Sequence, residues 1–140
     1  MTLKEIINAL NKISIEQPVV GEYIKSGNVY DLNSERNTKF GVFCCTNATH
    51  EYQVENALMS YTFYLYYIDR LSSDESNKTE IQSTGISTIN NIVRTLIEDY
   101  DLESSSINYE LFTERFSEMC AGVYGTVTIY VYDDGCIDRF

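Results

Sequence analysis

The sequence is poor in the residues on which catalytic sites most often depend. It has one histidine, one proline and no tryptophan, and its seven glycines are scattered. A catalytic triad, a histidine metal cluster or a proton shuttle therefore has His50 as its one histidine candidate, and no partner for it is evident. We interpret His50 as an exposed surface residue. Scattered glycines form no phosphate-binding loop, so the sequence predicts no enzyme, no cofactor and no catalytic residue.

The cysteines also lack a pattern that would indicate a metal site. They are Cys44, Cys45, Cys120 and Cys136, and no pair has metal-ligand spacing. Adjacent cysteines on a strand point to opposite faces, so Cys44 and Cys45 are predicted to be small apolar residues of the interior. No secretion-signal pattern opens the chain, and we expect reduced thiols in the cytoplasm. The acidic groups at 99–103 and 133–138 do not match a calcium loop and are expected to be solvated.

Basic residues are few in comparison with acidic ones. Ten Lys and Arg stand against 21 Asp and Glu, which gives a formal charge of −11. Such a domain repels phosphate backbones, so specific nucleic-acid binding is not expected, although an acidic wall could let DNA slide past. Surface acid that serves solubility is the simpler alternative. No run reaches the 18 or so apolar residues of a membrane helix, so no membrane association is expected.

What the chain does have is one long β-strand pattern over Ala57–Leu71. This run is rich in aromatic and β-branched residues, has no charge before Asp69 and contains neither Gly nor Pro. At about 3.3 Å per residue it would span roughly 50 Å, which exceeds an ordinary strand. Neither face of the strand is fully polar, so we expect a helix to cover one face and a neighbouring subunit or sheet to cover the other.

The rest of the first half is predicted from shorter patterns. Apolar residues at helical spacing predict a helix over 3–13, with Thr2 as its cap and Pro18 beyond its end. Val29–Leu32 is predicted to be a short strand after a turn. The segment 33–38 is expected to be a loop, and 39–46 a strand. A polar break at 47–51 then separates that strand from an extended ribbon over 52–70, with a bulge near residues 55 and 56.

The second half contains the main predicted helix. Asn77 and Glu80 form a capping-box-like pattern, and apolar residues recur over Ile81–Ile97. Gly85 interrupts the helix and indicates a close packing contact. Strands are predicted over 107–116 and 121–132, the second alternating clearly between apolar and polar residues, followed by a turn and a polar tail over 133–140. The predicted fold is α+β and a single domain over 1–140, with both helices packed on an antiparallel sheet that has a long β-hairpin.

Three segments carry a resemblance to a known family. At 63–71, 74–77 and 80–86 the chain resembles neck proteins of tailed bacteriophages, in particular those of crAss-like and related Bacteroidetes phages. The order of elements is similar to the tail-terminator and head–tail connector fold. The resemblance implies a non-enzymatic virion protein that forms a ring between portal, adaptor and tail proteins, through which genomic DNA passes without specific binding.

In this interpretation the hairpin over Lys39–Leu71 is the main oligomerisation element, a two-stranded arm that a second copy shelters. The predicted interface residues are Phe63, Tyr64, Tyr66, Ile68, Asp69 and Arg70. Asp69 and Arg70 could form an ion pair across subunits, or a local surface pair. The alternative is a monomeric module that binds a protein or peptide at an exposed sheet edge. A small enzyme that uses acidic residues is a third class, which a screen for bound metal or nucleotide would test.

Overall fold

The computed structural model describes residues 1–33 and 38–132 of the chain. Its elements, in chain order, are α1 (Leu3–Ile15), β1 (Glu22–Tyr23), the 3-10 helix η1 (Val29–Asn33), β2 (Val42–Gln53), β3 (Leu58–Arg70), α2 (Lys78–Tyr100), β4 (Glu103–Ser104), β5 (Asn108–Arg115) and β6 (Met119–Tyr132). The predicted loop at 34–37 and the predicted turn and tail at 133–140 lie outside the described residues. No helix of the described part is long and apolar enough to cross a membrane.

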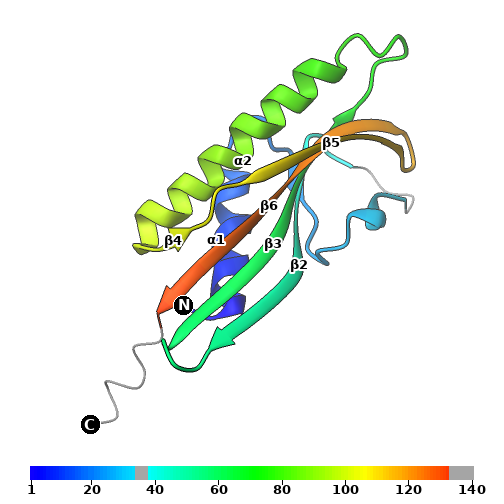
Figure 1. Cartoon of the computed structure of the whole chain (residues 1–140). Coiled ribbons are helices and arrows are strands. Elements are labelled where there is room, and N and C mark those ends of the chain that lie inside the picture. The colour runs from blue at the N-terminus through cyan, green and yellow to red at the C-terminus, as the bar shows by residue number, and fades with distance from the viewer. Residues whose placement is uncertain (34–37, 133–140) are drawn as a thin grey trace.

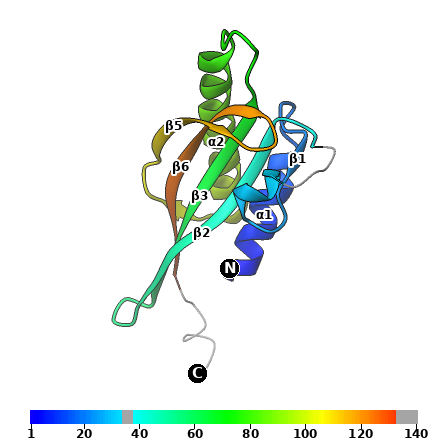
Figure 2. The ribbon, with the colours of Figure 1, turned by 90° about the vertical axis from the view of Figure 1, so that its right-hand side faces the viewer.

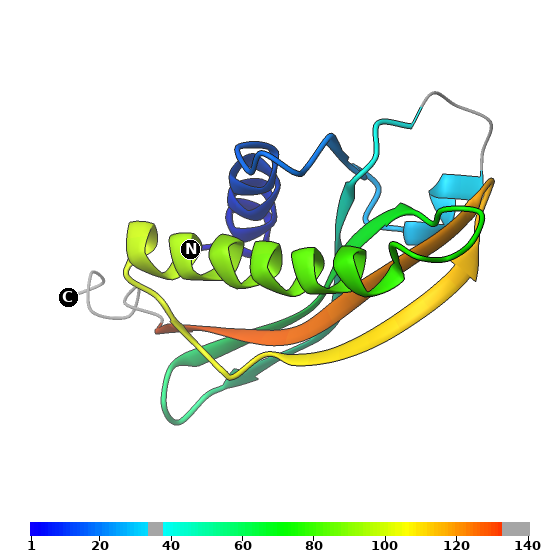
Figure 3. The ribbon, with the colours of Figure 1, turned by 90° about the horizontal axis from the view of Figure 1, so that it is seen from above.

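Both α-helices lie on the same face of a curled six-stranded sheet (Figures 1 and 3). The strand order is β1-β2-β3-β6-β4, and β5 pairs with the other end of β6. β1 runs parallel to β2, and the remaining pairs are antiparallel. The chain is therefore an α+β protein with both helices packed on the sheet, as the sequence predicts, although the short pair of β1 with β2 is parallel rather than antiparallel.

The long strand predicted over 57–71 is confirmed, but its surroundings differ from the prediction. On one side β3 pairs with β2, from Leu58 to Ile68. On its other side it pairs with β6 over its whole length, from Leu58 opposite Tyr132 to Arg70 opposite Cys120. The hairpin is thus not a free two-stranded arm, because β6 gives it a third strand. Its turn still extends past both helices (Figure 2).

The polar break predicted at 47–51 is wrong. β2 continues to Gln53, and the pairing register shifts between Asn47 and His50, which marks a β-bulge. The chain reverses at Val54–Ala57, where only a bulge was predicted, with Ala57 at φ 49°. Polar residues fit here because this part of β2 is an edge strand whose outer side faces solvent.

Two predictions about local structure near the N-terminus have opposite outcomes. The cap at Thr2 is confirmed, because its hydroxyl accepts a hydrogen bond from Glu5 N at 3.2 Å and Thr2 N donates to Glu5 Oε1 at 3.0 Å. The strand predicted at Val29–Leu32 is wrong, because these residues belong to η1. Asn28 Oδ1 accepts a hydrogen bond from Tyr30 N at 3.0 Å, and such local bonds favour a turn over a strand.

The main helix, α2, covers the predicted span but starts differently. Asn77 makes no capping hydrogen bond within the helix. Its side chain instead secures the connection from β3, accepting from Ser72 N at 2.8 Å and donating to Arg70 O at 3.2 Å. The predicted capping box is therefore wrong. The helix ends in the acidic segment 98–103, where Asp101 is a left-handed C-cap with φ 52°.

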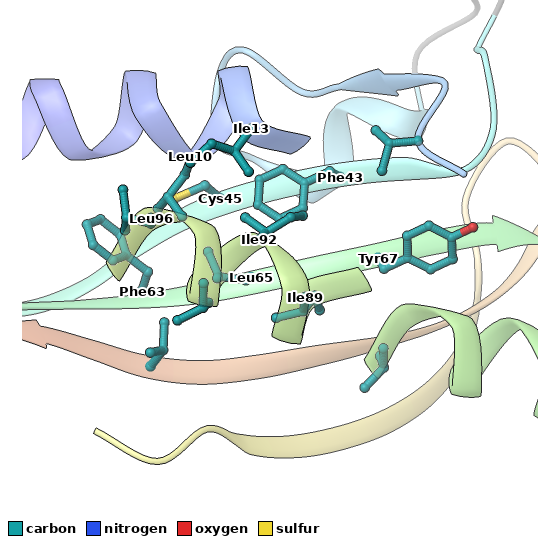
Figure 4. Packing of buried hydrophobic residues seen from close by; sticks show 14 of the residues in the cluster. Leu10, Ile13, Phe43, Cys45, Phe63, Leu65, Tyr67, Ile89, Ile92 and Leu96 are labelled. Atoms are coloured by element: carbon teal, nitrogen blue, oxygen red, sulfur yellow. The ribbon is translucent and has the colours of Figure 1, made fainter. Parts of the chain in front are cut away.

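Each face of the sheet packs against one cluster of buried hydrophobic residues. The larger lies between the helices and the sheet, and Figure 4 shows Phe43, Phe63, Leu65, Ile89, Ile92 and Leu96 packing within it. The smaller lies on the opposite face, where η1 covers the ends of β2, β3 and β6. Cys45 belongs to the first cluster and Cys44 to the second, as their adjacent positions on a strand predict. The strands predicted over 107–116 and 121–132 are confirmed as β5 and β6.

Candidate subunit interface

The sheet face away from the helices carries a patch of aromatic side chains beside the part of the face that η1 covers. The patch consists of Tyr64 and Tyr66 of β3, Phe112 of β5 and Tyr124 of β6. Tyr66 is central, with ring centroids 5.1 Å from Tyr124 and 6.1 Å from Phe112. Tyr64 meets Tyr124 edge to face at 5.8 Å and is 37% exposed. We call these four residues the aromatic patch.

Carboxylates at the rim of the patch accept hydrogen bonds from tyrosine hydroxyls. Tyr124 donates to Glu110 Oε2 at 2.5 Å, and Tyr30 of η1 donates to Glu114 Oε1 at 3.3 Å. The bond to Glu110 raises the pKa of Tyr124 to about 12. Tyr124 is therefore a neutral donor at physiological pH, and the patch has an apolar centre with an acidic rim.

Toward the hairpin turn, the side chains on the same face become smaller and more polar. Thr62 of β3 and Thr128 of β6 are opposite each other, and their hydroxyls are 2.8 Å apart. Hydroxyls of this kind can bind water or a partner equally well, so this part of the face does not need a covering layer to be stable. The aromatic patch is the part that would gain most from burial.

The structure divides the six predicted interface residues into three groups. Phe63 and Ile68 have no exposed surface, because each is buried in a core cluster of its own chain. They cannot contact a second copy, so their prediction as interface residues is corrected. Tyr64 and Tyr66 belong to the aromatic patch.

Asp69 and Arg70 lie at the end of β3, away from the patch centre. Arg70 has a partner in its own chain, since its Nε is 3.8 Å from Glu118 Oε2 and its guanidinium lies 5.1 Å from the centre of the Phe40 ring. Asp69 Oδ1 accepts a hydrogen bond from Arg70 N at 2.8 Å. Within the chain the surface ion pair of Arg70 is with Glu118, and the pairing of Asp69 with Arg70 across subunits stays a prediction.

Sequence reasoning missed Phe112 and the pairing of Tyr66 with Tyr124. The alternation in 121–132 places Tyr124 on the outer side of its strand, but a pattern within one strand does not give the register between strands. In the structure Tyr66 pairs with Tyr124, while Tyr64 pairs with Thr126. That register is what gathers the aromatic rings into one patch.

Two strand edges are also open. Among the described residues β1 covers only Val42 and Phe43 of β2, so the outer edge of β2 toward the turn has no strand partner. Within the same part of the chain β5 pairs with β6 alone. Unpaired N–H and C=O groups on such edges can accept a further strand.

His50 was predicted to be exposed on the surface, but the structure shows it half-buried. The bulge turns it toward the helix side, where its ring lies 5.4 Å from that of Tyr61 and 5.7 Å from that of Phe63. Its Nε2 is 3.2 Å from Asn47 Oδ1. No group of three or more metal-ligating side chains occurs in residues 1–33 and 38–132.

The sequence matches no protein-family model and no curated protein. The function is therefore inferred from the geometry of the sheet and from the resemblance of three sequence segments.

Proposed function

We propose that the chain is a structural subunit of the head–tail connector of a tailed bacteriophage, with a tail-terminator-like fold. Identical copies form a ring in the neck of the virion, between portal, adaptor and tail proteins, and genomic DNA passes through it. The ring is assembled in the host cytoplasm. The observation that carries this proposal is the aromatic patch, a cluster of large, partly exposed rings on the sheet face opposite the helices.

The composition of the patch suits contact between proteins. Tyrosine is enriched at interfaces because its ring gives a large apolar area while its hydroxyl tolerates water. A second copy seated on Tyr64, Tyr66 and Tyr124 would bury the ring surface that is still exposed. Head-to-tail contacts of one such surface with a different surface of the next copy close into a ring when the rotation between copies divides a full turn evenly.

The net charge fits a passage for DNA. A formal charge of −11 gives a ring of copies a strongly negative field, and this field keeps a polyanion from adhering to the wall. The same charge opposes close approach of copies, so we expect assembly to strengthen as salt concentration rises and screens that repulsion.

A second candidate function is supported by the open strand edges. A monomeric module could add an extended peptide to the free edge of β5 or of β2 beyond Phe43. This candidate leaves the aromatic patch without a role, which is why we prefer the ring.

Native mass spectrometry distinguishes the two candidates. The chain should be measured alone over a range of concentration and salt, and again after co-expression with the products of neighbouring genes. The ring proposal predicts a closed oligomer of identical subunits in at least one of these conditions. A monomer in all of them, together with capture of an extended peptide by the β5 edge, would favour the binding module instead.

A further inference from the structure

A pocket at the start of α2 has the features of a binding site, and it lies on the helix side of the sheet, away from the aromatic patch. Its volume is about 370 Å³. Phe40, Gly41 and Val19 form one wall, the end of β3 with Tyr67 and Asp69 forms the floor, and the first turns of α2 with Glu80 and Ile81 form the other wall. This volume is at the low end for ligand sites and suits a single side chain better than a cofactor.

The Tyr67 hydroxyl opens into this pocket without a hydrogen-bond partner. Tyr67 is only 2% exposed, and none of the described residues forms a hydrogen bond with its hydroxyl. Figure 4 shows the hydroxyl pointing away from the labelled aliphatic side chains of the core. Because this hydroxyl has no hydrogen-bond partner among the described residues and Tyr67 lines the pocket, it is available to bond a ligand atom that enters there.

Close packing fixes the position of that hydroxyl. A Cβ added at Gly41 would come within 2.5 Å of it, so the hydroxyl rests against a backbone segment that has no side chain. On the other side of the ring, a Cβ added at Gly85 would lie 3.0 Å from Tyr67 Cδ2. The ring is thus held between two glycines and is ordered before any ligand arrives.

Two carboxylates of the pocket are unneutralised. Neither Asp69 nor Glu80 lies within ion-pair distance of a lysine or arginine in the described part of the chain. Asp69 lies close enough to Tyr67 that its charge, after burial, contributes to raising the pKa of that hydroxyl to about 12. Two basic residues near the pocket have other partners, since Arg70 pairs with Glu118 and Lys78 with Glu75.

The helix N-terminus beside the pocket does not reverse this negative charge. The start of an α-helix carries about half a positive charge, which is less than the two full negative charges of Asp69 and Glu80. The pocket therefore favours a cation over an anion. An apolar wall with carboxylates on two sides favours a guanidinium, which is more weakly hydrated than an ammonium group.

We propose that this pocket receives an arginine side chain of a partner protein, with Asp69 and Glu80 binding the guanidinium and Tyr67 accepting one of its N–H bonds. We call it the arginine pocket. The proposal does not depend on the ring, because a short peptide is enough to test it on the isolated chain.

The test is a titration of the ¹⁵N-labelled chain with the peptide acetyl-Gly-Arg-Gly-amide, followed by amide chemical shifts. We expect saturable shifts of Gly41, Asp69 and Glu80, with a Kd on the order of 1 to 10 mM, as suits one side chain held by solvent-accessible ion pairs. The peptide with norleucine in place of arginine should cause no shifts at these amides, and the lysine peptide should bind several-fold more weakly.

Three variants make the result specific. Asp69→Asn and Glu80→Gln should each weaken binding of the arginine peptide about tenfold, and Tyr67→Phe, which removes only the unpartnered hydroxyl, should weaken it several-fold without loss of fold. Glu98→Gln on the exposed last turn of α2 is the matched control and should leave binding unchanged. Equal shifts with the norleucine peptide, tighter binding of lysine than of arginine, or shifts that appear with MgCl₂ but not with the arginine peptide would each overturn the proposal.

Discussion

Gly85 of α2 lies directly against Val123 of β6, and a Cβ at Gly85 would come within 2.5 Å of Val123 Cγ1. This contact lets the helix approach the sheet closely in the middle of the larger core cluster. It also explains why a residue that disfavours helix occupies a buried position in the longest helix of the described chain.

Gly85→Ala should therefore destabilise the protein although alanine is the better helix former. Overpacking of this kind costs about 1 to 3 kcal/mol, which exceeds the gain in helix propensity of about 1 kcal/mol. Urea unfolding followed by circular dichroism measures the balance. Ser83→Ala, at an exposed position of the same helix, is the control and should be neutral or stabilising by a few tenths of a kcal/mol.

Phe63 and Tyr64 are neighbours on β3 and should respond to mutation in opposite ways. Phe63→Ala removes a fully buried ring and should cost about 3 to 5 kcal/mol of folding stability. Tyr64→Ala removes a partly exposed ring and should cost on the order of 1 kcal/mol. Denaturant midpoints of the two monomers test this, and equal losses would mean that the strand faces have been assigned wrongly.

Thiol reactivity should report the burial of the cysteines. Cys44, Cys45 and Cys120 are free and buried, and burial raises the pKa of each, to about 11 for Cys44 and Cys120. Because the thiolate is the reactive form, a Cys136→Ser variant should react negligibly with Ellman's reagent near neutral pH when folded. The same variant should release one equivalent for each of these cysteines in guanidinium chloride. Rapid reaction of the folded protein would contradict the buried placement.

Stability should fall in alkaline solution. The folded-state pKa values of Cys44 and Cys120 are about 11 against 9.0 for a free thiol, and those of Tyr67 and Tyr109 are about 12 against 10.0 for a free phenol. A raised folded-state pKa means that the folded chain binds more protons than the unfolded one. The associated stability is fully present below about pH 9 and is lost as the pH rises toward the folded-state values. Urea midpoints measured from neutral pH upward should decline over this range, and less steeply in Cys120→Ala.

A strand could be predicted from the sequence where its apolar and polar residues alternate within that one segment. β3 and β6 were predictable because their apolar and polar residues alternate over many positions, as from Val123 to Val131. The continuation of β2 through 47–51 was not, since the polar residues of an edge strand look like those of a loop. The strand predicted at Val29–Leu32 failed because hydrogen bonds from Asn28 and its neighbours form a 3-10 turn instead.

The candidate interface was only half predictable for the same reason. Alternation along β3 separates Phe63 from Tyr64, but it does not reveal which face the helices cover. Residues from both faces were therefore predicted to be at the interface. The register of β3 with β6, and of β6 with β5, brings Tyr66, Tyr124 and Phe112 together, and register follows from contacts that no single segment encodes.

The central claim is that copies of this chain assemble through the aromatic patch. Native mass spectrometry of the double variant Tyr64→Lys with Tyr124→Lys, beside the wild type and an Asn91→Lys control on the exposed side of α2, tests it most directly. We predict a closed oligomer for the wild type and the control, and a folded monomer for the double variant under the same conditions. An oligomer of unchanged size in the double variant would contradict the claim.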